Sequence, residues 1–285
     1  MRGQSFAISA GVLYGTLGIF SALFYDYGGD SFALLLARFC AGGLIFLCIV
    51  LARRRPWPKL RVALLAVLVG PAQLAATAFL FVGFENASPG LVVLLFYIYP
   101  LLVTVGACLM FGDQLGRRRA ILLGIGMAGL ALTIGVPQAA SVIGVLCGVG
   151  AGIFTSIFIL GSQKVMARGI DPFQFVALAY GGSAVVVLAA APFHGLSPIS
   201  DEAMMYGALV VVVGTVLPAL FFYSAIRLIG AGPSARLATI EPVVAVALSL
   251  VVLGDSVTLG QIVGGALVLV AVVLIATSPT QKLAS

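Results

Sequence analysis

Long apolar stretches follow one another along the chain, and short polar or turn-forming segments separate them. We call them spans 1 to 10. A helix that crosses a bilayer needs about 20 predominantly apolar residues, and each span has that length. The pattern therefore predicts an all-α membrane protein with ten transmembrane helices. The spans lie at about residues 4–24, 31–52, 62–84, 89–111, 118–136, 142–162, 172–192, 205–227, 233–253 and 259–277.

Composition agrees with this interpretation and excludes a water-soluble fold. Apolar residues make up 62% of the 285 residues, and charged residues only 8%, against about 25% in a soluble domain. The connections between spans are too short for an additional domain. The four cysteines (Cys40, Cys48, Cys108 and Cys147) all fall inside apolar runs. They lack the spacing of a disulfide framework or a zinc site and are interpreted as small apolar residues.

Lys and Arg are distributed unevenly between the connections. Most of the 15 lie at the termini or in alternate connections, and the intervening connections hold none. Because basic residues mark the cytoplasmic side, we expect both termini in the cytoplasm of a bacterial inner membrane. The net charge of +6 is thus a topology signal, and no nucleic-acid partner is expected. The residues are Arg2, Arg53, Arg54, Arg55, Lys59, Arg61, Arg117, Arg118, Arg119, Lys164, Arg168, Arg227 and Lys282.

The two halves of the chain resemble each other. Sliding the sequence by 141 or 142 residues pairs Gly11 with Gly152, Asp30 with Asp171, Phe32 with Phe173, Phe79 with Phe221, Gly90 with Gly232 and Pro100 with Pro242. We therefore predict two five-helix repeats, 1–137 and 138–285. Because five is odd, the second repeat must enter the membrane in the opposite orientation. Inverted repeats of this kind are typical of secondary transporters.

Several motifs in these halves resemble the EamA repeats of the drug/metabolite transporter superfamily. That family shows a mid-span proline, a Gly-acid pair and then a Gly-rich helix, although it more often has Glu where Asp113 and Asp255 stand. The segment Phe96-Tyr97-Ile98-Tyr99-Pro100 and the overall similarity resemble the YddG-like bacterial exporters of aromatic and other amino acids. The matching positions are Tyr99-Pro100, Gly112-Asp113 and the segment around Gly124, then Glu241-Pro242, Gly254-Asp255 and the segment around Gly264, with Arg38-Phe39 in span 2.

Spans 5 and 10 are almost free of polar side chains, so we expect them at the periphery of the bundle. They carry small residues four apart, namely Ala120, Gly124 and Ala128 in one and Gly260 and Gly264 in the other. Such residues allow close helix packing. Two interpretations stay open at this point: packing within one protomer, or a homodimer interface through helices 5 and 10.

The other eight spans, 1–4 and 6–9, each carry polar or aromatic groups at mid-depth, which predicts a central cavity between them. Arg38 and Glu241 approach the bilayer midplane. We expect Arg38 to receive a substrate carboxylate and Glu241 or nearby carbonyls its ammonium group. Alternatively, the two charges neutralise each other, and some hydroxyls bond their own helix backbone. The candidate substrate-binding residues are Tyr14, Arg38, Gln73, Thr77, Tyr97, Tyr99, Ser156, Tyr180, Tyr223, Thr239 and Glu241.

Four prolines fall in the middle of spans 3, 4, 8 and 9, and these spans are equivalent in the two repeats. A proline inside a helix removes a backbone hydrogen bond and permits a kink. We expect these spans to bend or rock so that one side of the cavity closes as the other opens. The hinge candidates are Pro71, Pro100, Pro218 and Pro242.

The resemblance and the predicted repeat together favour a secondary transporter that exports small organic metabolites, most of all amino acids, aromatic ones included. A nucleotide-sugar or drug carrier of the same fold, an intramembrane enzyme and a non-transporting scaffold are the alternatives. No paired-Asp motif, H-E-x-x-H or P-loop is present, and His194 is the sole histidine. The G-x-G-x-x-G pattern at 124–129 lies within an apolar span, so it does not indicate a dinucleotide site. We expect no enzyme activity, cofactor or metal, and expect membrane lipid and a small-molecule substrate as partners.

Overall fold

A computed structural model describes residues 2–111, 117–134, 141–194, 198–229, 234, 237–238, 240–254 and 258–277. These residues are helical almost throughout and form no strand. In the first half, span 1 consists of α1 (Arg2–Gly15) and α2 (Leu17–Asp26), span 2 of α3 (Ser31–Leu36), the π-helix η1 (Ala37–Ala41) and α4 (Gly42–Ala52), span 3 of α5 (Leu60–Asn86), span 4 of α6 (Pro89–Phe96) and α7 (Tyr99–Phe111), and span 5 of α8 (Arg117–Ile134). In the second half, span 6 is α9 (Val142–Met166), span 7 is α10 (Pro172–His194), span 8 consists of α11 (Asp201–Val211), the π-helix η2 (Val212–Val216) and α12 (Leu217–Ile229), span 9 contains α14 (Glu241–Val252), and span 10 is α15 (Leu259–Thr277).

The helices agree closely with the ten predicted spans. Six of them, spans 1–3 and 6–8, are long and apolar enough to cross a membrane. Spans 4, 5, 9 and 10 contain shorter apolar helices. Span 9 begins earlier in the sequence prediction than α14 does, but most residues between 230 and 239 lie outside the described part of the chain. The all-α membrane fold is confirmed.

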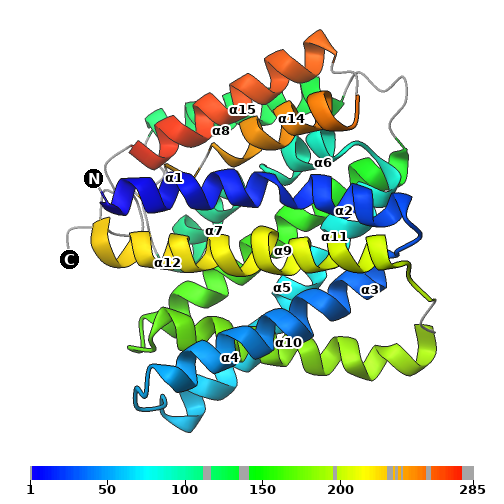
Figure 1. Ribbon diagram of the computed structural model, residues 1–285. Helices are drawn as coiled ribbons and strands as arrows, with labels where there is room; N and C mark the ends of the chain where they lie inside the picture. The colour runs from blue at the N-terminus through cyan, green and yellow to red at the C-terminus, as the bar shows by residue number, and fades with distance from the viewer. Residues whose placement is uncertain are drawn as a thin grey trace.

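The helices lie side by side in one bundle (Figure 1). α8 and α15 pack on each other at one edge, and α4 and α10 at the opposite edge, with α1 and α12 between them. The edge position of α8 and α15 confirms that the two helices poorest in polar groups are peripheral. They meet within one chain, where a Cβ added to Gly129 would lie 2.7 Å from the carbonyl oxygen of Gly264. A homodimer through these helices stays a prediction.

The strongest contacts join helices from opposite halves of the chain. α5 packs on α9, α1 on α12, α10 on α5 and α11 on α2. In the predicted repeat, span 3 is equivalent to span 8 and span 6 to span 1. The contact of spans 3 and 6 (α5 with α9) therefore has an equivalent in the contact of spans 8 and 1 (α12 with α1), and both contacts are present. The packing of the helices is therefore consistent with two equivalent repeats. The boundary at 137 and the opposite orientations of the repeats stay predictions.

Spans 2 and 7 are held together at both ends by stacked side chains. The guanidinium of Arg53 lies 3.9 Å from the ring centroid of Phe173. At the other end, the rings of Phe32 and His194 are stacked with centroids 4.3 Å apart. The offset of 141 residues that relates Phe32 to Phe173 also relates Arg53 to His194. Equivalent positions of the two predicted repeats thus make equivalent contacts.

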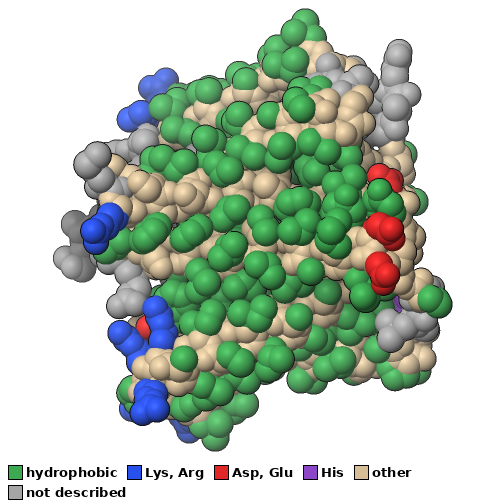
Figure 2. All heavy atoms as spheres, in the orientation of Figure 1, with side chains coloured by type: hydrophobic (Ala, Val, Ile, Leu, Met, Phe, Trp, Pro, Cys, Tyr) green, Lys and Arg blue, Asp and Glu red, His purple; other side chains and the backbone are tan. Residues whose placement is uncertain are grey.

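Charged side chains gather at the two ends of the bundle, and its sides are apolar. Figure 2 shows Lys and Arg at the end where α1 begins, and most of the visible Asp and Glu at the opposite end. Arg55 forms an exposed ion pair of 3.3 Å with Asp171 at the basic end. The separation of charge that the sequence predicts is therefore present on this face of the fold.

Candidate functional site

Arg38 lies inside the bundle in the π-helix η1, which interrupts span 2. Its side chain is only 5% exposed, and its Nε and Nη1 atoms have no hydrogen-bond partner among the described residues. The guanidinium carbon lies 5.8 Å from the ring centroid of Phe81. Single π-helical turns occur frequently at functional sites, and a buried guanidinium with unused donors is costly unless a ligand completes it.

Glu241 lies at a helix break. It is the first residue of α14, and its Oε2 accepts a hydrogen bond of 3.0 Å from the hydroxyl of Tyr97. Tyr97 itself occupies the break between α6 and α7. Two discontinuous helices, one from each half, therefore meet through this bond. Interrupted helices at mid-membrane are where many transporters bind substrate, because the breaks free polar backbone groups.

Arg38 and Glu241 are neighbours but do not form an ion pair. Their charges are close enough to interact, and both also act on the hydroxyl group of Tyr14 in α1. The sequence left open a direct neutralisation of the two charges, and this geometry does not show one.

Three further tyrosines, Tyr99, Tyr180 and Tyr223, lie near Tyr97 or Tyr14. Tyr97 and Tyr99 stack edge to face with centroids 5.5 Å apart. Tyr180 packs on Phe39, and Tyr223 lies 6.0 Å from Phe173. Tyr180 and Tyr223 also lie within electrostatic reach of Tyr14. Spans 1, 4, 7 and 8 thus each bring a predicted aromatic residue toward the site.

The predicted hydroxyl ligands are engaged elsewhere. Thr77 donates a hydrogen bond of 2.9 Å to the backbone oxygen of Gln73. Ser156 donates to the carbonyl oxygens of Gly152 at 2.7 Å and Tyr99 at 3.2 Å. These two residues follow the alternative in which a hydroxyl bonds the helix backbone. The Gln73 side chain is half-buried in α5.

The hinge candidates occupy different local settings. Pro71 lies inside the continuous helix α5, and Pro218 is the second residue of α12, directly after η2. Pro100 and Pro242 are the second residues of α7 and α14, where a helix tolerates proline because no hydrogen bond is lost. The side chain of Pro100 and all of Thr239 lie outside the described part of the structure.

Sequence reasoning did not anticipate the two π-helices or the role of Phe81 beneath Arg38. The second π-helix, η2, contains Thr215, which donates a hydrogen bond of 2.9 Å to the carbonyl oxygen of Val210, five residues earlier. No residue pattern marks a π-helix in an apolar span. The mid-span Thr in span 8 was the only available signal.

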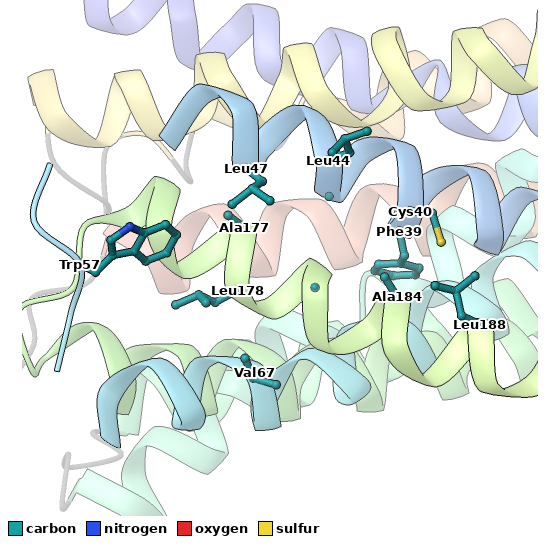
Figure 3. A pocket seen from close by; sticks show the side chains of 12 residues that line it. Phe39, Cys40, Leu44, Leu47, Trp57, Val67, Ala177, Leu178, Ala184 and Leu188 are labelled. Carbon is teal, nitrogen blue, oxygen red and sulfur yellow. The ribbon is translucent and has the colours of Figure 1, made fainter. Parts of the chain in front are cut away.

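A separate apolar groove of about 460 Å³ opens on the side of the bundle. It lies between span 2 and α10, with Trp57 at one end and Leu188 at the other (Figure 3). Phe39 lines this groove, whereas Arg38, its neighbour in sequence, does not. The groove is thus distinct from the centre formed around Arg38 and Glu241.

An all-helical bundle with apolar sides and charged ends is typical of a multi-pass membrane protein. The EamA-like transporter family model matches residues 1–135 and again residues 142–277. The chain belongs to this family.

Curated relatives and a solved structure agree with this assignment. An uncharacterized transporter of Archaeoglobus fulgidus is 24% identical over 275 residues, which cover 95% of each chain. An uncharacterized transporter of Synechocystis is 25% identical over 211 residues, 69% of this chain and 61% of that protein. A crystal structure superposes with a TM-score of 0.66 at 20% identity, covering 96% of this chain and 98% of its own. At this level of identity, the likeness shows a shared fold alone.

Proposed function

We propose that this membrane transporter of the EamA-like family exports amino acids, aromatic ones included, by alternating access through the centre between spans 1–4 and 6–9. The observation that carries the proposal is the buried guanidinium of Arg38, whose Nε and Nη1 find no partner in the described part of the chain although the Glu241 carboxylate is near enough to interact. A zwitterion fits such a pair of separated opposite charges, because it brings its own anion and cation.

The substrate carboxylate binds the guanidinium of Arg38, where two parallel hydrogen bonds are available to a planar acceptor. The ammonium group binds Glu241 and the carbonyl oxygens freed at the break before α14. Tyr14, Tyr97 and Tyr99 contact the substrate side chain, and aromatic walls of this kind favour apolar and aromatic side chains.

Alternating access uses the two breaks. The bond from Tyr97 to Glu241 joins span 4 to span 9 at mid-depth, so a substrate that replaces this bond frees the two broken helices to tilt apart. Pro71, Pro100, Pro218 and Pro242 act as the flexible points of the moving spans. The basic end of the bundle faces the cytoplasm of a bacterium, with both termini on that side.

The test is counterflow of labelled phenylalanine into liposomes that contain the purified protein and excess internal amino acid. We expect uptake by the native protein and a loss of about 10- to 100-fold for Arg38→Gln, the range for a charged hydrogen bond. Arg117→Gln, an exposed charge change on α8, is the matched control. Unchanged transport by Arg38→Gln overturns the proposed carboxylate site.

Two additions to this assay separate the alternatives. An imposed pH gradient that stimulates the native protein but not Glu241→Gln identifies proton exchange at that carboxylate. If folded protein moves no amino acid, labelled nucleotide sugars and drugs are tested in the same liposomes, and their uptake assigns the chain to a carrier of those compounds. Absence of uptake for all of them favours a non-transporting role.

A further inference from the structure

The apolar groove between span 2 and α10 is built by small residues on facing helices. Gly43 contributes from α4, and Gly181 and Ala184 contribute from α10. A Cβ added to Gly181 would meet no atom within 4 Å, so the space beside this glycine is open. The walls are the apolar side chains that Figure 3 shows on both sides, from Leu47 and Ala177 to Leu188. The groove therefore suits a flexible hydrocarbon chain.

One end of the groove reaches the basic connection between spans 2 and 3. Trp57 from this connection lines the groove, and indole rings favour the headgroup level of a bilayer. The connection is fixed to the start of α10, because Gln174 donates a hydrogen bond of 2.9 Å to the backbone oxygen of Pro56. A fixed connection holds Trp57 in place beside the groove.

The cations of this connection are not all committed to protein contacts. Arg53 lies over Phe173, and Arg55 pairs with Asp171. Arg54 and Lys59 are exposed and take part in neither contact. Arg54 also has a positive φ of 47°, a backbone conformation that non-glycine residues rarely adopt. Two exposed cations thus lie within three residues of Trp57 in the same connection.

From this arrangement we infer that the groove is a binding site for an anionic phospholipid. One acyl chain lies in the groove, and the phosphate lies at Arg54 and Lys59 beside Trp57. A juxtamembrane cation attracts an anionic headgroup more strongly than a zwitterionic one. This site is independent of the proposed amino-acid transport.

A second copy of the chain is a less suitable occupant. Two copies in one membrane share an orientation, so a dimer through this groove would bring the run Arg53, Arg54 and Arg55 close to the same run of its partner. Like charges at the same depth repel. An anionic lipid has the complementary charge, and its hydrocarbon matches the groove.

An occupied groove would also contact the element that carries the central arginine. Phe39 and Cys40 line the groove from η1, and Arg38 belongs to the same π-helical turn. Phe39 packs on Tyr180 with centroids 5.0 Å apart. A bound acyl chain therefore lies one aromatic layer from the polar centre.

The experiment measures lipids that stay bound to purified protein after extraction from nanodiscs with equal phosphatidylglycerol and phosphatidylcholine, by native mass spectrometry. We expect one retained phosphatidylglycerol on the native protein. Gly181→Leu fills the groove and should remove it. Gly124→Leu is the matched control, because a Cβ at Gly124 on α8 also meets no atom within 4 Å. Equal retention of both lipids by the native protein, or full retention by Gly181→Leu, overturns the site.

A charge variant tests the headgroup part. The double change Arg54→Asn with Lys59→Gln should lower the preference for phosphatidylglycerol about tenfold or more, and Asn tolerates the positive φ of residue 54. Arg117→Gln with Arg118→Gln removes two exposed cations elsewhere and should leave the preference unchanged. A preference that survives the first double change overturns the headgroup assignment. A dimer that Gly181→Leu dissociates would assign the groove to a second copy instead.

Discussion

The hydroxyl of Tyr97 donates a hydrogen bond of 3.0 Å to Oε2 of Glu241. The two residues are 144 positions apart and lie at the breaks of spans 4 and 9, so this one bond joins both discontinuous helices. A buried carboxylate needs such a donor, because water is scarce around it. A movement of the two halves relative to each other at this point would therefore lengthen or break the bond between Tyr97 and Glu241.

Removal of the Tyr97 hydroxyl should destabilise the protein and slow transport. In Tyr97→Phe the ring remains, but the half-buried carboxylate of Glu241 loses its donor, which costs about 1–3 kcal/mol of unfolding free energy. Denaturant titration in detergent measures this loss, and counterflow measures transport. Tyr206→Phe is the control, since the Tyr206 ring stacks on Tyr27 at the end of the bundle. An unchanged unfolding midpoint for Tyr97→Phe would contradict the importance of the bond.

Changing the prolines at the two breaks should reduce transport more than changing the one inside α5. A proline lacks a backbone N–H and its ring crowds the preceding turn, so Pro100→Ala with Pro242→Ala allows spans 4 and 9 to straighten across their breaks. We expect counterflow to fall in this double variant at normal expression. Pro71→Ala restores one backbone donor within a helix that is already continuous, so its effect should be smaller. Normal transport by the double variant removes the hinge hypothesis.

Spans 3 and 7 approach so closely at Gly70 that no larger residue fits. A Cβ at Gly70 would collide with the carbonyl oxygen of Ala179, and Ser183 donates a hydrogen bond of 2.8 Å to the oxygen of Gly70. We expect Gly70→Ala to lower the melting temperature and the yield of folded protein. Gly181→Ala, two residues from Ala179 on α10, meets open space and should behave like the native chain. Thermal unfolding of the two variants provides the comparison.

The two end stacks should contribute unequally to stability. Phe173 is 1% exposed beneath Arg53, so Phe173→Ala should cost about 3–5 kcal/mol of unfolding free energy. Phe32 is only half-buried beside the exposed His194, and Phe32→Ala should cost less. Parallel denaturant titrations rank the two variants, and equal losses would show that the stacks are equivalent in energy as well as in position.

The spans could be predicted from the sequence because the membrane imposes one simple requirement. Each helix must be about 20 apolar residues long, and predicted limits such as 31–52, 89–111 and 259–277 coincide with the observed helices. The peripheral position of α8 and α15 followed from their lack of polar groups. These features depend on local composition, which is fully visible in the chain.

The arrangement around the centre could be predicted only in part. Mid-depth position identified Arg38 and Glu241 as candidates, but their separation and the bond from Tyr97 depend on how distant helices pack. Thr77 and Ser156 looked equally polar in sequence, yet both bond to backbone oxygens. The π-helix around Arg38 has no sequence signature, because its extra residue is accommodated by contacts with neighbouring helices.

The cross-pairing of helices has a consequence for how the protein is made. α1 packs on α12, α5 on α9 and α8 on α15, so helices of the first half find their main partners in the second. Ribosomes add about 5–20 residues per second, which leaves the first half in the bilayer for on the order of ten seconds before its partners are complete. During synthesis, lipid must therefore solvate surfaces that later become protein interior, and the packing of the two halves is complete only after translation has passed α15.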